Sequence, residues 1–407
     1  MDIQAGIGVP TRGRGAGGVV LGIDFGTSYT SAGAFIDGRV DLVRDSGEPM
    51  IPSVVYVPPR GEMVVGARAL SHALHEPQHT VASVKRLLGE RRDPETLRRL
   101  APTVPYPLVG GAGGRVYLRM HNQDLATEQI AAAILGHVRD LAERRFGAVR
   151  RVVLAVSAVA SLQQRQALLE AARLARLEVV DMVAEPIAGA IALGLHARPA
   201  PRRVLVCDFG GGTFDVTLIE QAGARFHVAA IGGDPFLGGD DLDHAVVHAL
   251  AGLIHRRCRF DVSHDVVRRQ LLAMRCEAVK RVLSTQLEAR LVMRDAFIES
   301  GERRDLDVVM ERSWCEALWA PLFARAIAEV DRVLAKAGWS DDMLDEIGLV
   351  GGTALVPQFQ RLLRTRFAGR PVRLADDAHV AVATGTALVA ARHAGPAAVS
   401  VSASPET

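Results

Sequence analysis

Two widely separated segments of the chain repeat one pattern of apolar and polar positions. Each begins as a short apolar run typical of a buried strand, ends in an aspartate, passes through a turn rich in glycine and hydroxyl residues, and resumes as a strand. The first copy occupies residues 19–35 with DFGTS at 24–28, and the second occupies residues 204–219 with DFGGGT at 208–213. A repeat at this distance predicts two similar lobes rather than a solenoid, whose repeating units are much shorter.

Between and after these two hairpins, the pattern alternates between strand and helix periods. Apolar runs typical of strands stand at residues 151–156, 178–183 and 347–350. Helical periodicity covers residues 127–146, 163–176, 187–195, 240–257, 265–283 and 313–337. This alternation predicts an α/β protein with mainly parallel or mixed sheets.

The same pattern suggests how the chain is divided. We place lobe I at residues 19–202, lobe II at residues 203–375, and a terminal helix that returns to lobe I at residues 376–393. Residues 1–18 are rich in Gly, Arg and Pro and lack the apolar core of a signal peptide, so we expect a disordered leader. Residues 394–407 are rich in Ala, Ser and Pro, and we expect a disordered tail.

Composition narrows the function. The chain has 407 residues, which suits two lobes, and 49% of them are hydrophobic, enough for sizeable cores. A net charge of +2 argues against binding to nucleic acid or to an anionic membrane surface. No apolar run is long and charge-free enough to span a bilayer. The four cysteines are scattered without a CxxC pair, so we expect buried thiols in a reducing cytoplasm.

The two turns are suited to phosphate. Consecutive backbone N–H groups in a tight glycine-rich turn can form an anion-binding nest, and Thr27, Ser28 and Thr213 add hydroxyl donors. Asp24 and Asp208 would repel a bare phosphate, but they suit a hydrated Mg²⁺ lying between acid and phosphate. The chain contains no GxxxxGK[ST] loop and no GxGxxG strand-to-helix turn, so P-loop and dinucleotide folds are disfavoured.

Three further features could belong to the same site, and each has a plainer alternative. Glu185 stands at a strand-to-helix junction, where a carboxylate could face metal or water or could simply favour the helix start. One helix face could clamp a nucleoside or be an ordinary solvated charged face, and it carries Glu277, Lys280, Arg281 and Ser284. Residues 351–353 (GGT) form a third turn that would allow the backbone to approach a sugar or α-phosphate closely.

Lysine is scarce in this chain. Among 48 basic residues only Lys85, Lys280 and Lys336 are lysines. Lysine offers a compact point charge where arginine offers a wide planar fork. Each lysine is therefore a candidate for chemistry that arginine cannot perform, although some would survive by chance.

These motifs, in this order, resemble the nucleotide-binding domain of the DnaK-type chaperones, the 70-kilodalton heat-shock proteins, over residues 20–393. The matching segments are residues 22–29, 84–89, 184–190, 208–216, 237–243, 276–284 and 351–353. The resemblance implies a two-lobed, actin-like ATPase fold of the duplicated ribonuclease H-like kind, and hydrolysis of ATP to ADP and phosphate. Lys85 and Lys280 both fall where the family pattern has lysine.

The resemblance also implies residue roles. Asp24 and Asp208 would position Mg²⁺ through water, and Lys85 would contact the γ-phosphate and help to place the attacking water. The implied catalytic residues are Lys85, Glu185, Asp208, Thr213 and Asp215. The implied ATP- or ADP-binding residues are Gly26, Thr27, Ser28, Tyr29, Gly210, Gly211, Gly212, Glu277, Lys280, Arg281, Ser284, Gly351, Gly352 and Thr353.

The sequence departs from the family pattern in four ways. Leu355 replaces the adenine-stacking arginine, Ser157 replaces the proline that couples hydrolysis to the next domain, and His379 replaces an acidic residue of the adenosine site. The chain also ends soon after the terminal helix, so we expect a stand-alone form without the peptide-binding domain. Loss of one stacking partner costs on the order of 1 kcal/mol, so we expect weaker nucleotide binding.

We therefore expect an ATP-hydrolysing switch whose lobes close on the nucleotide. One alternative is a non-catalytic nucleotide-sensing scaffold, suggested by Leu355 and Ser157. The other is an actin-like filament protein or a small-molecule kinase of the same superfamily. We expect a monomer that acts with a protein partner, and a J-domain protein, a nucleotide-exchange factor or the product of a neighbouring gene would all fit.

Overall fold

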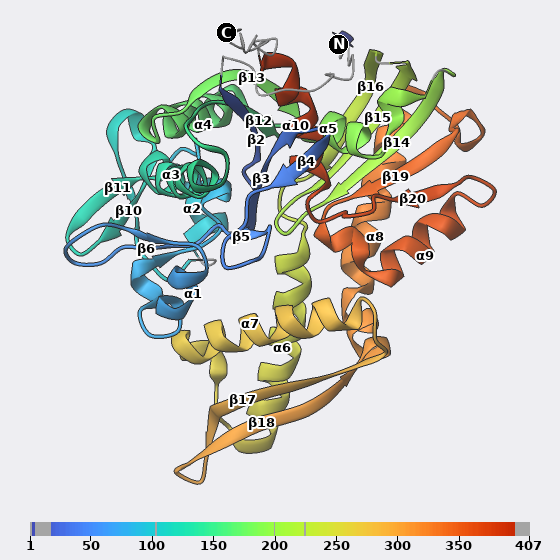
Figure 1. The fold of residues 1–407 in the computed structure, drawn as a ribbon. Coiled ribbons are helices and arrows are strands. Elements are labelled where there is room, and N and C mark those ends of the chain that lie inside the picture. Colours follow the sequence, from blue (N-terminus) through green and yellow to red (C-terminus); the bar gives the residue numbers. More distant parts are fainter. Residues whose placement is uncertain (1, 5–17, 102–103, 199, 224, 395–407) are drawn as a thin grey trace, which may run out of the picture.

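A computed structural model describes residues 2–4, 18–101, 104–198, 200–223 and 225–394 of the chain. Two large mixed sheets organise it, each with helices on both faces (Figure 1). We call the first sheet with its helices lobe I and the second sheet with its helices lobe II. The protein thus has the two-lobed, actin-like α/β fold that the sequence predicts.

The sheet of lobe I runs in the order β13-β12-β2-β3-β4, and β5 pairs with β3. Its hairpin of β2 and β3 is antiparallel, whereas β12 runs parallel to both β2 and β13. The strands are β2 (Val19–Asp24), β3 (Tyr29–Ile36), β4 (Arg39–Leu42), β5 (Ile51–Pro52), β12 (Val149–Val156) and β13 (Glu178–Ala184).

The sheet of lobe II repeats this arrangement in the order β1-β16-β15-β14-β19-β20. Here β14 and β15 form the antiparallel hairpin, and β19 runs parallel to β14. The strands are β1 (Asp2–Gln4), β14 (Arg202–Phe209), β15 (Phe214–Ala222), β16 (Arg225–Asp234), β19 (Glu346–Val350) and β20 (Val372–Leu374). Every residue of β19 is buried, as expected for a strand covered on both faces.

Two helices pack between the sheets, α5 (Glu185–Ala192) and α10 (Ala381–Ala390) (Figure 1). Helix α10 lies on β2 and β3, α5 lies against β14, and the two helices contact each other. The contact is close: a Cβ added at Gly385 would lie 1.9 Å from the carbonyl oxygen of Ala188. The two sheets are therefore joined through a tightly packed helical layer.

The outer faces of the sheets carry the other long helices. Helices α3 (Thr127–Phe146) and α4 (Leu162–Leu174) pack over lobe I. In lobe II, α8 (Arg312–Ala337) packs on β15 and β16 and α9 (Pro357–Arg366) contacts β20, whereas α6 (Gly239–Cys258) and α7 (Val266–Leu283) pack on each other. None of the described helices is long and apolar enough to cross a membrane.

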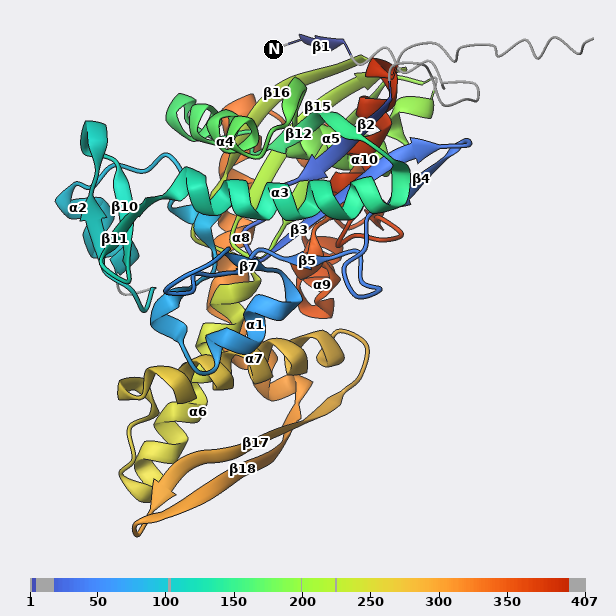
Figure 2. The same ribbon diagram turned by 60° about the vertical axis from the view of Figure 1, so that its left-hand side comes forward.

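Smaller elements extend each lobe, and Figure 2 shows the helix Ala67–Ala73 of the lobe I extension close to α7. In lobe II, β17 (Glu288–Glu299) and β18 (Glu302–Glu311) form a long hairpin below α6 and α7. Lobe I adds α1 (Ala67–Ala73), α2 (Pro94–Leu100), β6 (Val55–Tyr56), β7 (Val64–Val65), β8 (Thr80–Val81), β9 (Leu108–Gly110), β10 (Val116–Met120) and β11 (Gln123–Ala126).

The chain ends differ in part from the sequence-based expectation. Asp2–Gln4 is not disordered but pairs antiparallel with β16, which would otherwise be an edge strand with unpaired backbone groups. The rest of the predicted leader, up to residue 17, and the predicted tail from residue 395 lie outside the described residues. The terminal helix is shorter than predicted and ends in a 3₁₀ turn at Ala391–His393.

Helix α5 has different boundaries from those predicted by the sequence. The predicted helix 187–195 begins at Glu185, with Pro186 in its first turn, and ends at Ala192. Gly194 follows with φ of 75°, a left-handed conformation that stops a helix. This earlier start places Glu185 at the helix N-terminus, in the cleft between the lobes.

Candidate nucleotide and metal site

The two hairpin turns face each other across the cleft and line a cavity of about 340 Å³. Most of the predicted site residues line this one cavity, although they come from segments far apart in the sequence. They are Asp24, Gly26, Thr27, Ser28, Tyr29, Lys85, Glu185, Asp208, Gly210, Gly211, Gly212, Thr213, Glu277, Lys280, Arg281, Ser284, Gly351, Gly352 and Thr353. Asp215 instead lines a second cavity of about 470 Å³, which shares Lys85 and Thr213 with the first.

Glycine is required where the two turns meet. A Cβ at Gly211 would lie 2.2 Å from the hydroxyl oxygen of Ser28, and one at Gly26 would lie 2.0 Å from the carbonyl oxygen of Tyr29. The third turn is attached to the second hairpin, because the hydroxyl of Thr353 donates to the carbonyl oxygen of Gly210 at 2.7 Å. All three glycine-rich turns therefore meet around one space.

We call the side of the cavity at the strand ends the acidic end. It contains Asp24, Glu185 and Asp208, with Asp215 directly behind. Lys85 donates to Glu185 at 2.8 Å, and both side chains are largely buried. Burial acts against the charge of Lys85, but Glu185 and Asp24 outweigh it, so the pKa of Lys85 is raised and the ammonium stays charged.

The carboxylates of the acidic end are poorly neutralised. Burial raises the pKa of Asp24 to about 7, with Glu185 adding to the rise and Lys85 opposing it. The pKa of Asp215 is also raised to about 7, by burial and then by Glu185. The pKa of Asp208 is raised well above its usual range, first by burial and then by the neighbouring carboxylates. Four acids thus share one lysine.

This charge imbalance fits a divalent cation. A buried cluster of carboxylates facing a single ammonium is stabilised by additional positive charge. Among the described residues no group of three or more His, Cys, Asp or Glu side chains could hold a metal ion directly. Asp24 and Asp208 remain the predicted partners of a hydrated ion, since Mg²⁺ in proteins commonly keeps several waters and uses one or two carboxylates.

We call the opposite side of the cavity the α7 end. The hydroxyl of Tyr29 donates to Glu277 at 2.7 Å, and the Arg281 guanidinium lies over the Tyr29 ring at 4.8 Å and 3.3 Å from Glu277. The ammonium of Lys280 donates to Asp243 at 2.6 Å and to the carbonyl oxygen of Gly239 at 2.7 Å. The charged groups of this end therefore pair with one another.

These contacts refine two sequence-based readings. The helix face from Glu277 to Ser284 is not a freely solvated charged face, because all four of its side chains line the cavity. Glu185 has the position required for both interpretations, because it begins helix α5 and also lines the acidic end of the cavity. Lys280, predicted to contact ribose, is already held by Asp243 and has one ammonium proton left for another acceptor.

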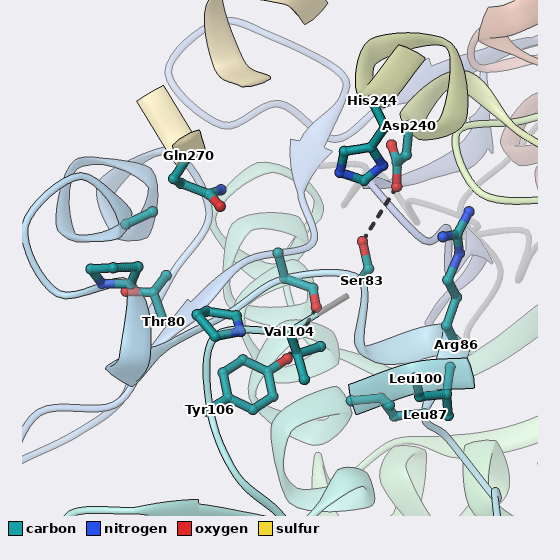
Figure 3. Close-up of a pocket in the computed structure, with 14 residues that line it drawn as sticks. Thr80, Ser83, Arg86, Leu87, Leu100, Val104, Tyr106, Asp240, His244 and Gln270 are labelled. Carbon is teal, nitrogen blue, oxygen red and sulfur yellow. Dashed lines mark hydrogen bonds between the residues drawn. The ribbon is translucent and has the colours of Figure 1, made fainter. Parts of the chain in front are cut away.

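Sequence reasoning missed Asp240 as a site residue. Its carboxylate accepts from the hydroxyl of Ser28 at 2.8 Å. It also accepts from the hydroxyl of Ser83 at 3.4 Å (Figure 3). Ser83 precedes Lys85 by two residues and has a left-handed φ of 54°. Its hydrogen bond to Asp240 therefore connects the loop that carries Lys85 to lobe II. The lobe I side chain of Arg86 adds a hydrogen bond to the carbonyl oxygen of Gly212 at 2.8 Å. The cleft is thus closed by direct contacts between lobes.

The model of the family described as "Hsp70 protein" matches residues 20–401. This chain belongs to the Hsp70 family. Similar relatives include "Heat shock 70 kDa protein BIP3" of Oryza sativa subsp. japonica, 34% identical over 91% of this chain, and "Heat shock cognate HSP70 protein" of Trypanosoma brucei brucei, 34% identical over 90%. "Heat shock 70 kDa protein, mitochondrial" of Solanum tuberosum is 33% identical over 94%.

The matches to these Hsp70 relatives extend over only part of their chains. The alignments cover 56%, 55% and 56% of the three relatives, so this chain spans little more than half of their length. Leu355 and His379, two of the predicted departures from the family pattern, both line the cavity.

Proposed function

We propose that this Hsp70-family chain binds ATP with Mg²⁺ and hydrolyses it to ADP and phosphate, and that its lobes close around the nucleotide. The observation that carries the proposal is the acidic end, where Lys85, Glu185 and three aspartates meet beside two glycine-rich turns. Phosphoryl transfer requires mainly positioning and charge neutralisation, and this set of groups supplies both.

Each group has a distinct task in this proposal. Backbone N–H groups of the turns and the Thr213 hydroxyl would donate hydrogen bonds to phosphate oxygens, and the ammonium of Lys85 would face the γ-phosphate. Glu185 and Asp215 would orient the attacking water and accept its hydrogen bonds. Mg²⁺, when bound, would neutralise charge on the phosphates, and Asp24 and Asp208 would orient its waters.

We infer lobe closure from hydrogen bonds that cross the cleft between the lobes. Asp240 and Arg86 connect the lobes directly, and Tyr29 reaches Glu277 on α7. These contacts leave the two turns on opposite sides of one nucleotide-sized space. A nucleotide that touches both turns would favour the closed arrangement over an open one.

Single-turnover hydrolysis of ATP by the whole chain tests the proposal. We expect Lys85→Ala to slow hydrolysis by about 100-fold or more, because a buried cation that faces the transferred phosphate is removed. Lys336→Ala is the matched control, since Lys336 is an exposed lysine whose ammonium contacts the carbonyl oxygen of Ile231. Equal rates for wild type and Lys85→Ala, or no ATP binding by calorimetry, would contradict the proposal.

A second candidate function is nucleotide sensing without turnover. Leu355 favours it, because this residue gives the cavity an aliphatic group where the family pattern has a stacking arginine. ADP or ATP binding with no detectable product would support this alternative. In either case we propose a protein partner, such as a J-domain protein or an exchange factor, and a nucleotide-dependent pull-down from the source cell would identify it.

A further inference from the structure

Ser157 makes a contact that the proline of the family pattern could not make. It follows β12 in lobe I, and its hydroxyl donates to Oδ1 of Asp215 in lobe II at 3.0 Å. Both residues line the second cavity, together with Lys85 and Thr213. The hydrogen bond therefore crosses between the lobes directly behind the acidic end.

The direction of this hydrogen bond is fixed by its surroundings. The backbone N–H of Val159 donates to the Ser157 hydroxyl oxygen at 3.3 Å, so the oxygen already acts as an acceptor. A hydroxyl carries one proton, which is left for Asp215. Arg165 holds the same loop, because its guanidinium donates to the carbonyl oxygens of Ser157 at 3.4 Å and Ala160 at 3.2 Å.

Asp215 receives side-chain hydrogen bonds from Thr213 of its own lobe and from Ser157 of lobe I. Its side chain is 2% exposed and stands at a register position opposite Asp208, so nearby carboxylates repel it. A buried carboxylate is held in one orientation only where donors reach its oxygens. The donor supplied by Ser157 is present only when the two lobes are together, since the residues belong to different sheets.

We propose that Ser157 is a positioning residue, which orients the Asp215 carboxylate from across the cleft and so links lobe closure to hydrolysis. The inference rests on the proposed ATP hydrolysis and adds to it a residue that acts through Asp215. Proline at this position offers neither the donor to Asp215 nor the acceptor for Val159. This link between the lobes is therefore specific to a hydroxyl at residue 157.

The test compares two substitutions of equal shape in the whole chain. Ser157→Thr keeps the hydroxyl, whereas Ser157→Val replaces it with a methyl group. We expect Ser157→Val to slow single-turnover ATP hydrolysis about tenfold, the effect of losing one hydrogen bond to a charged group. Ser157→Thr should stay within about threefold of wild type, and ATP dissociation constants measured by calorimetry should change less than about twofold for both.

The controls separate this inference from the proposed function. Ser161→Ala removes a neighbouring hydroxyl that caps α4 without contacting Asp215, and should hydrolyse ATP as wild type does. A wild-type rate in Ser157→Val, or an equal loss in Ser157→Thr, overturns the positioning role while a slow Lys85→Ala variant leaves ATP hydrolysis standing. A wild-type chain without turnover overturns both.

Discussion

The two ends of the cavity solve the problem of buried charge in different ways. At the α7 end, Glu277 pairs with Tyr29 and Arg281, and Lys280 pairs with Asp243, so the protein neutralises its own charges. At the acidic end, four carboxylates share Lys85, and three of them have raised pKa values. The charges of the first end are neutralised within the protein, whereas the carboxylates of the second share too little positive charge.

The predicted departures from the family pattern replace neither the four carboxylates nor Lys85. Leu355 and His379 line the cavity, and the loss of one stacking contact there weakens binding only modestly. A change at the acidic end should cost more, because the four carboxylates and Lys85 all interact with one another. The comparison predicts large effects for changes near the acidic end and small ones at residue 355.

The largest effect is expected from Gly26→Ala in the first turn. The new Cβ would lie 2.0 Å from the carbonyl oxygen of Tyr29, so the turn must deform. We expect ATP affinity, measured by calorimetry, to fall by about 100-fold as the turn loses its nest of N–H groups. Gly136→Ala is the matched control: it lies in α3 with open space around it, and should leave affinity unchanged while stabilising the helix by roughly 0.5–1 kcal/mol. Equal affinities for the two variants would contradict the close-approach argument.

An intermediate effect is expected from pH on the nucleotide-free chain. Asp24 and Asp215 have folded-state pKa values of about 7, raised from 3.8, so the folded state binds protons that the unfolded state releases. Their contribution to stability is fully present below the unfolded pKa and is lost as pH rises through about 7. Each group can contribute a slope of up to about 1.4 kcal/mol per pH unit.

Urea unfolding between pH 5 and pH 8 measures this slope, with Asp24→Asn as the comparison. The amide cannot ionise, so the decline in the free energy of unfolding should be shallower in the variant. Saturating ATP and Mg²⁺ should also flatten the decline in wild type, because added cations favour the ionised carboxylates. The same slope in wild type and Asp24→Asn would show that the acidic end is neutralised by other means.

The smallest effect is expected at residue 355 of the cavity lining. Leu355→Arg should tighten ATP binding by about fivefold, the value of one stacking or cation–π partner of about 1 kcal/mol. Leu362→Arg adds the same charge on α9 at a position outside the cavity lining, and should change affinity little. An increase of equal size in both variants would indicate general electrostatic attraction rather than contact with the base.

Local patterns in the sequence were sufficient for much of this protein. The hairpins, the long helices and the buried strands follow from apolar periodicity and turn residues, which act over a few neighbouring positions. The helix 127–146 was predicted with the boundaries of α3, whereas α5 begins two residues earlier than predicted and ends at Ala192, before Gly194. Boundaries depend on single dihedral angles, which composition specifies less firmly than element type.

The partners of individual site residues could not be predicted in the same way. Ser28 and Asp240 are 212 positions apart, Ser157 and Asp215 are 58 apart, and neither pair has a local spacing that indicates contact. Asp2–Gln4 was likewise expected to be disordered, because the unpaired edge of β16 is not visible in residues 1–18.

The sequence by itself therefore determined the two phosphate-type turns, the α/β alternation and the residue types available for chemistry. Only the tertiary structure decided that the acids of both lobes share a single lysine, that Lys280 is held by Asp243, and that Ser157 reaches Asp215. The physical reason is the separation in sequence between the residues that interact. Backbone conformation is set by near neighbours, whereas burial and electrostatic shifts depend on which distant segments the packing of two sheets brings together.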